Sequence, residues 1–231
     1  MALRRRDESY AGPIRRALEP GEWSPPGSGV LNHNGDNLSQ SKSKIKLPDE
    51  KEWKERAAKI RQLVREAEQN SQLTSDGTHR YRGQGTATSK NGFGTFVGSN
   101  YTDSGEWKNN KLNGFGTSLD PQGNWYEGEF KDFEMNGYGR KVFNDGSSYF
   151  GEWACSQRDG FGRWEYSDGA VYEGELKAEL RHGEGIYVDG NGDIWEGDWR
   201  FGKFVDGVVN RRKEQKVEQW RNGKAVAPKK W

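Results

Sequence analysis

The chain has 231 residues, of which 32 are glycine and 13% are aromatic, while hydrophobic residues make up only 31%. This composition excludes the thick aliphatic core of an ordinary globular domain and favours a thin structure in which aromatic rings lie over backbone. The net charge of +1 hides a segregation, because residues 1–80 carry +3, residues 81–210 carry −8 and residues 211–231 carry +6.

Residues 1–47 mix Pro, Gly, Ser, Asn and charged side chains without any apolar period. Such a segment lacks the apolar content to fold alone, so it is predicted to be a disordered basic arm. Its basic start consists of Arg4, Arg5, Arg6, Arg15 and Arg16.

Between Pro48 and about Asn70, apolar residues recur at the spacing of one helix face among many Lys, Arg and Glu. These apolar positions are Trp53, Ala57, Ile60, Val64 and Ala67. The sequence therefore predicts an amphipathic helix over residues 48–70, with the proline near its first turn. Two interpretations stay open: the helix packs as a lid on the first repeats, or it binds a partner.

The next segment is built on a glycine that returns at intervals of 22, 23, 23, 23 and 23 residues. These six anchor glycines are Gly83, Gly105, Gly128, Gly151, Gly174 and Gly197. Bulky side chains stand two residues before and two residues after most anchors, and a pair of glycines follows nine and eleven residues after each of the first five. The sixth unit has Asp206 and Val208 at those two positions. A fixed period of this length marks a repeat architecture.

Each unit is predicted to be a hairpin. Alternation along a strand places Tyr126, Gly128 and Phe130 on one face. If the chain then turns and returns antiparallel, Gly128 lies opposite Gly139 and Phe130 lies opposite Gly137. The glycines would then be sockets that leave room for the aromatic rings of the neighbouring strand.

A second turn closes each unit and joins it to the next. It is carried by Asp-Gly, Asn-Gly and related pairs, which are strong turn signals. The four segments are PQGN from Pro121, NDGS from Asn144, SDGA from Ser167 and GNGD from Gly190.

The motif Y-x-G-x-W, followed by G-x-G with a period of about 23 residues, resembles the MORN repeat (membrane occupation and recognition nexus). The resemblance implies an all-β fold: an elongated, single-layer antiparallel meander with six MORN repeats over residues 81–207, preceded by the arm and the helix. Residues 208–231 are predicted to hold a degenerate seventh repeat, VEQWRNGK at Val217–Lys224, and a basic tail. The repeat-defining glycines are Gly128, Gly137, Gly139, Gly151, Gly160, Gly162, Gly174, Gly183 and Gly185.

No reactive constellation is expected. Cys155 is the only cysteine, which excludes an internal disulfide, and His33, His79 and His182 are too scattered to suggest zinc. An acidic residue follows most anchors, at Glu106, Glu129, Glu152, Glu175 and Asp198, and is predicted to form a solvated acidic face rather than catalytic pairs. A phosphate-binding loop is followed by a helix, whereas no helical pattern follows the G-x-G segments of this chain. We therefore predict a non-enzyme without cofactor or metal.

Two functions are compatible with these features. The first is a scaffold whose aromatic face binds protein partners; this face is Tyr126, Phe130, Tyr149, Trp153, Tyr172, Trp195 and Trp199. The first six of these side chains are expected to lie partly exposed along one concave face, because a single-layer sheet has nothing else to cover them. The second is a peripheral membrane module that binds anionic lipid, as has been proposed for MORN repeats. The −8 charge of the repeats disfavours the membrane for that region, and the absence of a basic stripe disfavours nucleic acid.

The predicted location follows from similar reasoning. No apolar run approaches the roughly 18 residues of a membrane span, and the basic start lacks the apolar core of a signal peptide. The stretch from Gly151 to Glu175 resembles MORN-repeat proteins of sperm and cilia. That resemblance implies a cytoplasmic, cytoskeletal protein of the ciliary or flagellar axoneme, which contacts other axonemal proteins and tubulin through its basic ends.

Overall fold

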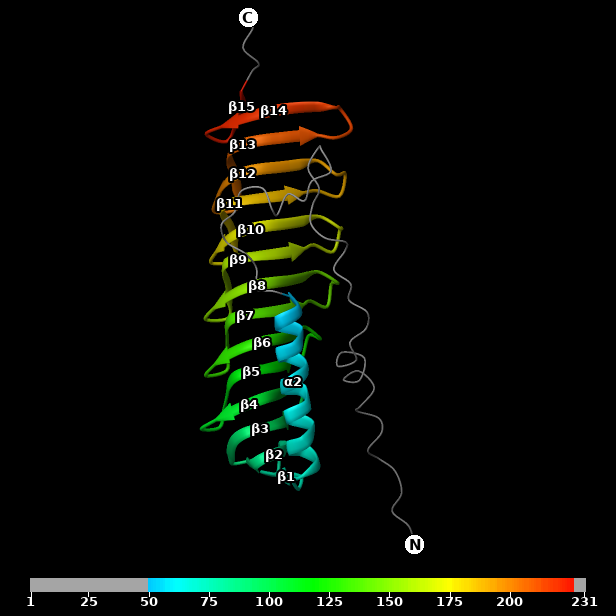
Figure 1. Cartoon of the computed structure of the whole chain (residues 1–231), viewed down its shortest axis with the longest axis vertical. Helices are drawn as coiled ribbons and strands as arrows, with labels where there is room; N and C mark the ends of the chain where they lie inside the picture. Colours follow the sequence, from blue (N-terminus) through cyan, green and yellow to red (C-terminus); the bar gives the residue numbers. More distant parts are fainter. Residues whose placement is uncertain (1–49, 227–231) are drawn as a thin grey trace, which may run out of the picture. The chain divides into compact units, whose positions relative to one another are not determined.

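The computed structural model describes residues 50–226, which form one open antiparallel sheet of fifteen strands and a single helix (Figure 1). The strands lie in the sheet in sequence order, so the predicted all-β meander is confirmed. The predicted arm over residues 1–47 and the last residues of the basic tail, 227–231, lie outside the described residues.

Helix α2 spans Glu50–Gln69 and precedes all the strands. The strand bounds follow the repeat: β1 (Thr74–Ser75), β2 (Arg80–Thr86), β3 (Ser89–Val97), β4 (Thr102–Lys108), β5 (Lys111–Leu119), β6 (Trp125–Lys131), β7 (Glu134–Val142), β8 (Ser148–Ala154), β9 (Gln157–Glu165), β10 (Val171–Lys177), β11 (Leu180–Val188), β12 (Ile194–Arg200), β13 (Lys203–Arg211), β14 (Lys216–Arg221) and β15 (Lys224–Val226).

Most units turn tightly between their two strands. In the β6–β7 hairpin the two turn residues are Asp132 (φ 53°) and Phe133 (φ 74°). Positive φ at both central positions is type I′ geometry, whose twist matches that of the flanking strands. Two-residue turns with positive φ recur at Asn109/Asn110, Cys155/Ser156, Ala178/Glu179, Phe201/Gly202 and Asn222/Gly223.

The predicted second turns are present at the opposite ends of the strands. In the β5–β6 turn, a carboxylate oxygen of Asp120 accepts hydrogen bonds from the backbone N–H groups of Gln122 (3.0 Å) and Asn124 (2.9 Å). Asp189 holds the β11–β12 turn in the same way. These side chains satisfy backbone donors that no strand can pair.

A continuous row of glycines crosses the sheet from β2 to β13, one from each strand. Consecutive members are paired: Gly83, Gly94, Gly105, Gly116, Gly128, Gly139, Gly151, Gly162, Gly174, Gly185, Gly197 and Gly207. The predicted pairing of Gly128 with Gly139 is confirmed. The sixth unit joins the row through Gly207, ten residues after its anchor rather than eleven.

The predicted pairing of Phe130 with Gly137 is wrong. Phe130 pairs with Met135, because a β-bulge after Gly128 shifts the register within the hairpin. Gly137 pairs instead with Trp153 of the next unit. The bulge recurs after most of the anchor glycines, and a simple two-residue alternation cannot anticipate it.

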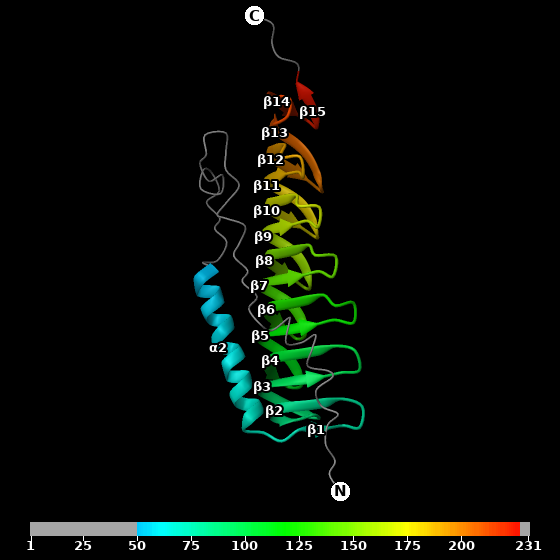
Figure 2. The same ribbon diagram turned by 90° about the vertical axis from the view of Figure 1, so that its right-hand side faces the viewer.

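Helix α2 lies along one face of the sheet, beside β2 to β7, in both views (Figures 1 and 2). Its predicted apolar positions Ala57, Val64 and Ala67 are buried. The structure therefore has the helix packed on the repeats. We call this side of the sheet the helix face, and the opposite side, which carries the tyrosines and tryptophans of the repeat, the aromatic face.

Candidate functional site

The aromatic row selected from the sequence is the core of the protein. Tyr149 and Tyr172 are 0% exposed, and only Trp195 of the seven residues is half-buried. The buried members are Tyr126, Phe130, Tyr149, Trp153, Tyr172 and Trp199. The expectation that this row lies partly exposed on a concave face is wrong, so these side chains cannot supply the main contact surface for a partner.

The row is buried because its rings pack on the glycines of neighbouring strands and against one another, and because their polar atoms donate hydrogen bonds to backbone carbonyls. The ring of Tyr126 occupies the space that a Cβ on Gly139 would fill, and its hydroxyl donates a hydrogen bond to the Glu129 carbonyl (3.0 Å). Trp153 donates its indole N–H to the Gly139 carbonyl (3.0 Å), and its ring packs edge-on against Tyr126 at 5.4 Å. The socket interpretation of the glycines is confirmed for these tyrosines.

The same hydrogen bonds recur through the stack. Tyrosine hydroxyls donate to the carbonyl three residues ahead at Tyr81, Tyr149 and Tyr172, and indole N–H groups donate to row glycines at Trp107 and Trp199. Burial accordingly raises the pKa of Tyr81 to about 12.

Cationic side chains that the sequence reasoning missed lie over the aromatic face. The Arg158 guanidinium lies 3.4 Å from the ring centroid of Trp164, and the Arg181 guanidinium lies 4.2 Å from that of Trp199. The Lys90 ammonium lies 4.7 Å from the Phe96 ring centroid. These three cations stand seven residues after an anchor glycine. A basic residue that recurs at this position of the repeat was the signal in the sequence that could have predicted these cations.

The acidic residues after the second to fifth anchors are half-buried, which corrects the predicted solvated acidic face. Glu106 and Glu152 each accept a hydrogen bond from a backbone N–H of the returning strand, of Phe115 (3.2 Å) and Phe161 (3.3 Å) respectively. Asp198 of the sixth unit is exposed. The carboxylates therefore satisfy donors that the bulge releases from the strand ladder.

The contact between α2 and the sheet combines rings and charges. The Trp53 ring lies 5.9 Å from Phe115 on β5 and 5.3 Å from Phe150 on β8. Arg56 donates to Glu129 on β6 at 2.5 Å, and its guanidinium lies over the Phe115 ring at 5.4 Å. An aromatic anchor flanked by basic side chains is thus what this face of the repeats binds.

A second ion pair of α2 is buried. Arg61 donates to Glu127, whose side chain is almost completely inaccessible to solvent. Burial raises the pKa of the Glu127 carboxyl above its ordinary value, although Arg61 and Arg140 oppose this shift. The desolvation of the carboxylate therefore outweighs its ion pairing.

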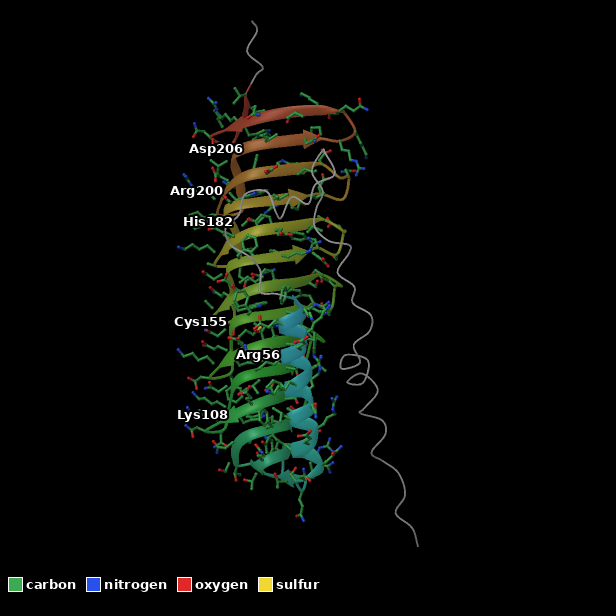
Figure 3. All side chains as sticks on the ribbon, in the orientation of Figure 1. Arg56, Lys108, Cys155, His182, Arg200 and Asp206 are labelled. Atoms are coloured by element: carbon green, nitrogen blue, oxygen red, sulfur yellow. The ribbon has the colours of Figure 1, made fainter. Side chains whose placement is uncertain are left out.

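The two-residue turns line up along one edge of the sheet, which we call the tip edge. Exposed apolar side chains project there, with Phe133 47% exposed, Leu180 45% and Phe201 59%. Exposed basic residues flank these turns: Lys108, Lys111, Lys131, Lys177, Arg200 and Lys203. Figure 3 shows Lys108, Cys155 and Arg200 on this edge and Arg56 on the helix. The tip edge is thus basic although the repeat region as a whole is acidic.

The described residues contain no group of three or more His, Cys, Asp or Glu side chains that could hold a metal ion. Cys155 is exposed in the β8–β9 turn. Within residues 50–226, no helix has the length and hydropathy needed to cross a membrane.

Four consecutive segments match the family model of the MORN repeat: residues 104–125, 126–148, 149–171 and 172–194. They contain the second to fifth anchor glycines, so the chain carries a run of four MORN repeats, and the module is a non-catalytic one. Units one and six, which depart from the motif, lie outside the match. A search among curated proteins finds no match to this chain.

Proposed function

We propose that the protein is a non-enzymatic scaffold that holds helical protein segments on its repeats, within the ciliary or flagellar axoneme. The proposal rests on the docking of α2 against one face of the sheet. This face contacts the helix through Trp53, Arg56 and Arg61. The same antiparallel strand pairing continues through the other units, so their backbone could support a helix in the same way.

The axonemal location is supported by resemblance. The stretch from Gly151 to Glu175, with SQR at Ser156–Arg158 and the following YEG, is similar to MORN repeat-containing protein 3 of sperm and cilia. The basic ends of the chain, +3 over residues 1–80 and +6 over residues 211–231, suit the acidic tails of tubulin.

Fractionation of ciliated cells tests this proposal. A tagged copy is expected to stay with the microtubule fraction after detergent extraction and to leave it as the salt concentration rises, because the contact is ionic. A cytosolic protein with the same tag serves as control. Complete release by detergent from an intact axoneme would contradict the scaffold.

The tip edge favours a second candidate, binding to anionic membrane. Phe133, Leu180 and Phe201 are exposed among lysines and arginines. Apolar side chains of this kind insert into a lipid leaflet, and the basic side chains around them are attracted by anionic headgroups. In this candidate the full chain sediments with phosphatidylserine vesicles, and the pair Phe133→Ser and Phe201→Ser reduces the bound fraction severalfold. Equal sedimentation of both proteins would remove this candidate.

A further inference from the structure

The helix face continues beyond the end of α2. From β9 onward, no described helix lies on it (Figures 1 and 2). Val171, Val188 and Ile194 lie side by side on this part of the face, each half-buried, because Val188 pairs with both of the others. They form an apolar stripe across β10, β11 and β12.

An acidic stripe runs beside it. In the third unit, the residues on either side of the anchor are Glu127 and Glu129, which hold Arg61 and Arg56 of α2. The fifth and sixth units repeat this pair as Glu173/Glu175 and Glu196/Asp198. The strand between them adds the exposed Glu184.

Some of these carboxylates have no cationic partner among the described residues. Glu173 is paired with Arg163 at 3.2 Å. By contrast, no ion pair joins Glu184, Glu196 or Asp198 to another residue within 50–226. The positions that bind arginine in the third unit are therefore present and unneutralised in the sixth.

We propose that the helix face of β10 to β13, called here the second seat, binds a basic amphipathic helix of a partner protein in the manner of α2. This inference rests on the proposed scaffold function and names the class of segment that the scaffold takes. The apolar side of the partner helix covers Val171, Val188 and Ile194, and its arginines or lysines meet Glu196 and Asp198. The three strand spacings from β10 to β13 correspond to about 14 Å, the length of a helix of about 10 residues.

The charge of the second seat decides between classes of partner. Carboxylates on this face repel lipid phosphates and nucleic-acid backbone, whereas they attract a basic helix. The α2 contact supplies the second, independent argument, since it shows the same acidic pair holding arginine within the same protein.

A peptide with the sequence of residues 50–69 is a suitable probe, because it carries the known side chains for this type of contact. Its binding to the full chain is measured by fluorescence anisotropy. We expect saturable binding that Glu196→Lys with Asp198→Lys weakens at least about tenfold. A peptide carrying Arg56→Glu and Arg61→Glu should be weakened to a similar degree. Circular dichroism verifies that each variant retains the sheet.

The matched control is Glu134→Lys with Glu214→Lys, which makes the same change of charge at exposed positions outside the second seat. Binding should be unaltered in this control. Binding that survives Glu196→Lys with Asp198→Lys but is lost in Glu127→Lys would mean exchange with the resident α2 and would overturn the proposal. So would the absence of binding at about 1 mM peptide. If the reversal alters only self-association in sedimentation velocity, the seat belongs to a second copy and the proposal also fails.

Failure of the peptide experiment is distinguishable from failure of the scaffold proposal. The peptide experiment uses purified protein, whereas the scaffold is tested by retention with the axoneme. A protein that stays with the axoneme but does not bind the peptide keeps its scaffold role and loses only the second seat.

Discussion

At the scale of single residues, the glycine row decides where the aromatic rings lie. A Cβ on Gly162 would overlap the ring and hydroxyl of Tyr149, and the same holds for Gly139 and Tyr126. The glycines therefore cost conformational entropy in the strands but allow a buried, hydrogen-bonded ring in each unit. The ring contacts then link one hairpin to the next.

Gly162→Ala should destabilise the protein by about 1–3 kcal/mol, because the methyl group displaces the Tyr149 ring from a packed core. Gly162 does not have positive φ, so the effect reports lack of space rather than backbone strain. Thermal unfolding followed by circular dichroism measures the change.

The control is Gly190→Ala, at a position where the nearest heavy atom to the added Cβ is a carbonyl oxygen at 3.3 Å and φ is not positive. This variant should lie within about 0.5 kcal/mol of the parent protein. Equal losses in the two variants would show that the sockets are not specifically intolerant of side chains.

A second prediction at this scale concerns the tyrosine hydroxyl. Tyr149→Phe keeps the ring and removes the hydrogen bond to the Glu152 carbonyl (3.1 Å). The expected loss is about 0.5–1.5 kcal/mol, smaller than the effect of filling the socket. Denaturant unfolding of both variants gives the comparison, and a larger loss for Tyr149→Phe than for Gly162→Ala would reverse this ranking.

At the scale of elements, the period of the glycines was sufficient to predict the hairpins, their order and the Gly128–Gly139 pairing. The period was not sufficient to predict the β-bulge. The bulge adds one residue to one strand of most hairpins, so it changes the pairing register without changing the spacing of the anchor glycines. The exposure of the aromatic row was predicted wrongly for a related reason. A single-layer sheet suggests uncovered rings, whereas here rings of neighbouring units and cations such as Arg158 cover one another.

The helix was predictable from its apolar spacing, but its contacts were not. Nothing in the sequence joins Arg56 to Glu129, 73 residues away, until the sheet brings β6 under the helix. The same is true of the second seat. The acidic pairs of the second seat can be read from the sequence as E-G-E and E-G-D. Only the contact of α2 with the third unit shows that such a pair binds arginine side chains.

The docking of α2 should depend on its buried alanine. Ala57 is 0% exposed, so Ala57→Glu places a carboxylate in the buried contact of the helix with the sheet face whose carboxylates pair with Arg56 and Arg61. We expect the helix to undock while the sheet persists, because burying an unpaired charge costs several kcal/mol. The tryptophan emission of the protein should shift to longer wavelength as Trp53 leaves the contact, whereas Lys59→Glu on the exposed side should leave the emission unchanged.

Glu127 makes this contact sensitive to pH. Its folded-state pKa is raised, so the folded protein binds the proton more tightly than the unfolded chain, and ionisation of Glu127 lowers stability as pH rises. Glu127→Gln should therefore raise the unfolding temperature at pH 7. The gain should shrink as the pH falls toward the ordinary pKa of glutamate, where the parent residue is also neutral. A variant that is less stable at pH 7 would show that the ion pair with Arg61 outweighs the desolvation.

At the scale of the whole described sheet, each strand pairs only with its neighbours, and ring contacts such as Trp153 on Tyr126 reach one strand further, into the adjacent unit. The stability of such a stack is approximately a sum of the stabilities of its units and of the contacts between adjacent units. Helix α2 is the exception, since it joins β2, β3, β4 and β5 to one another and reaches Phe150 on β8. The first half of the sheet is therefore tied together by a long-range contact that the second half lacks within the described residues.

Hydrogen exchange should resolve these two halves. In the parent protein, backbone amides of β3 to β7 should exchange more slowly than those of β10 to β14, because α2 covers the former. Undocking by Ala57→Glu should accelerate exchange in β3 to β7 and leave β10 to β14 unchanged, since nearest-neighbour contacts do not transmit the loss across several units. Lys59→Glu again serves as the control. Uniform acceleration across all the strands would instead show that the sheet opens as one cooperative unit, and the additive description of the stack would be wrong.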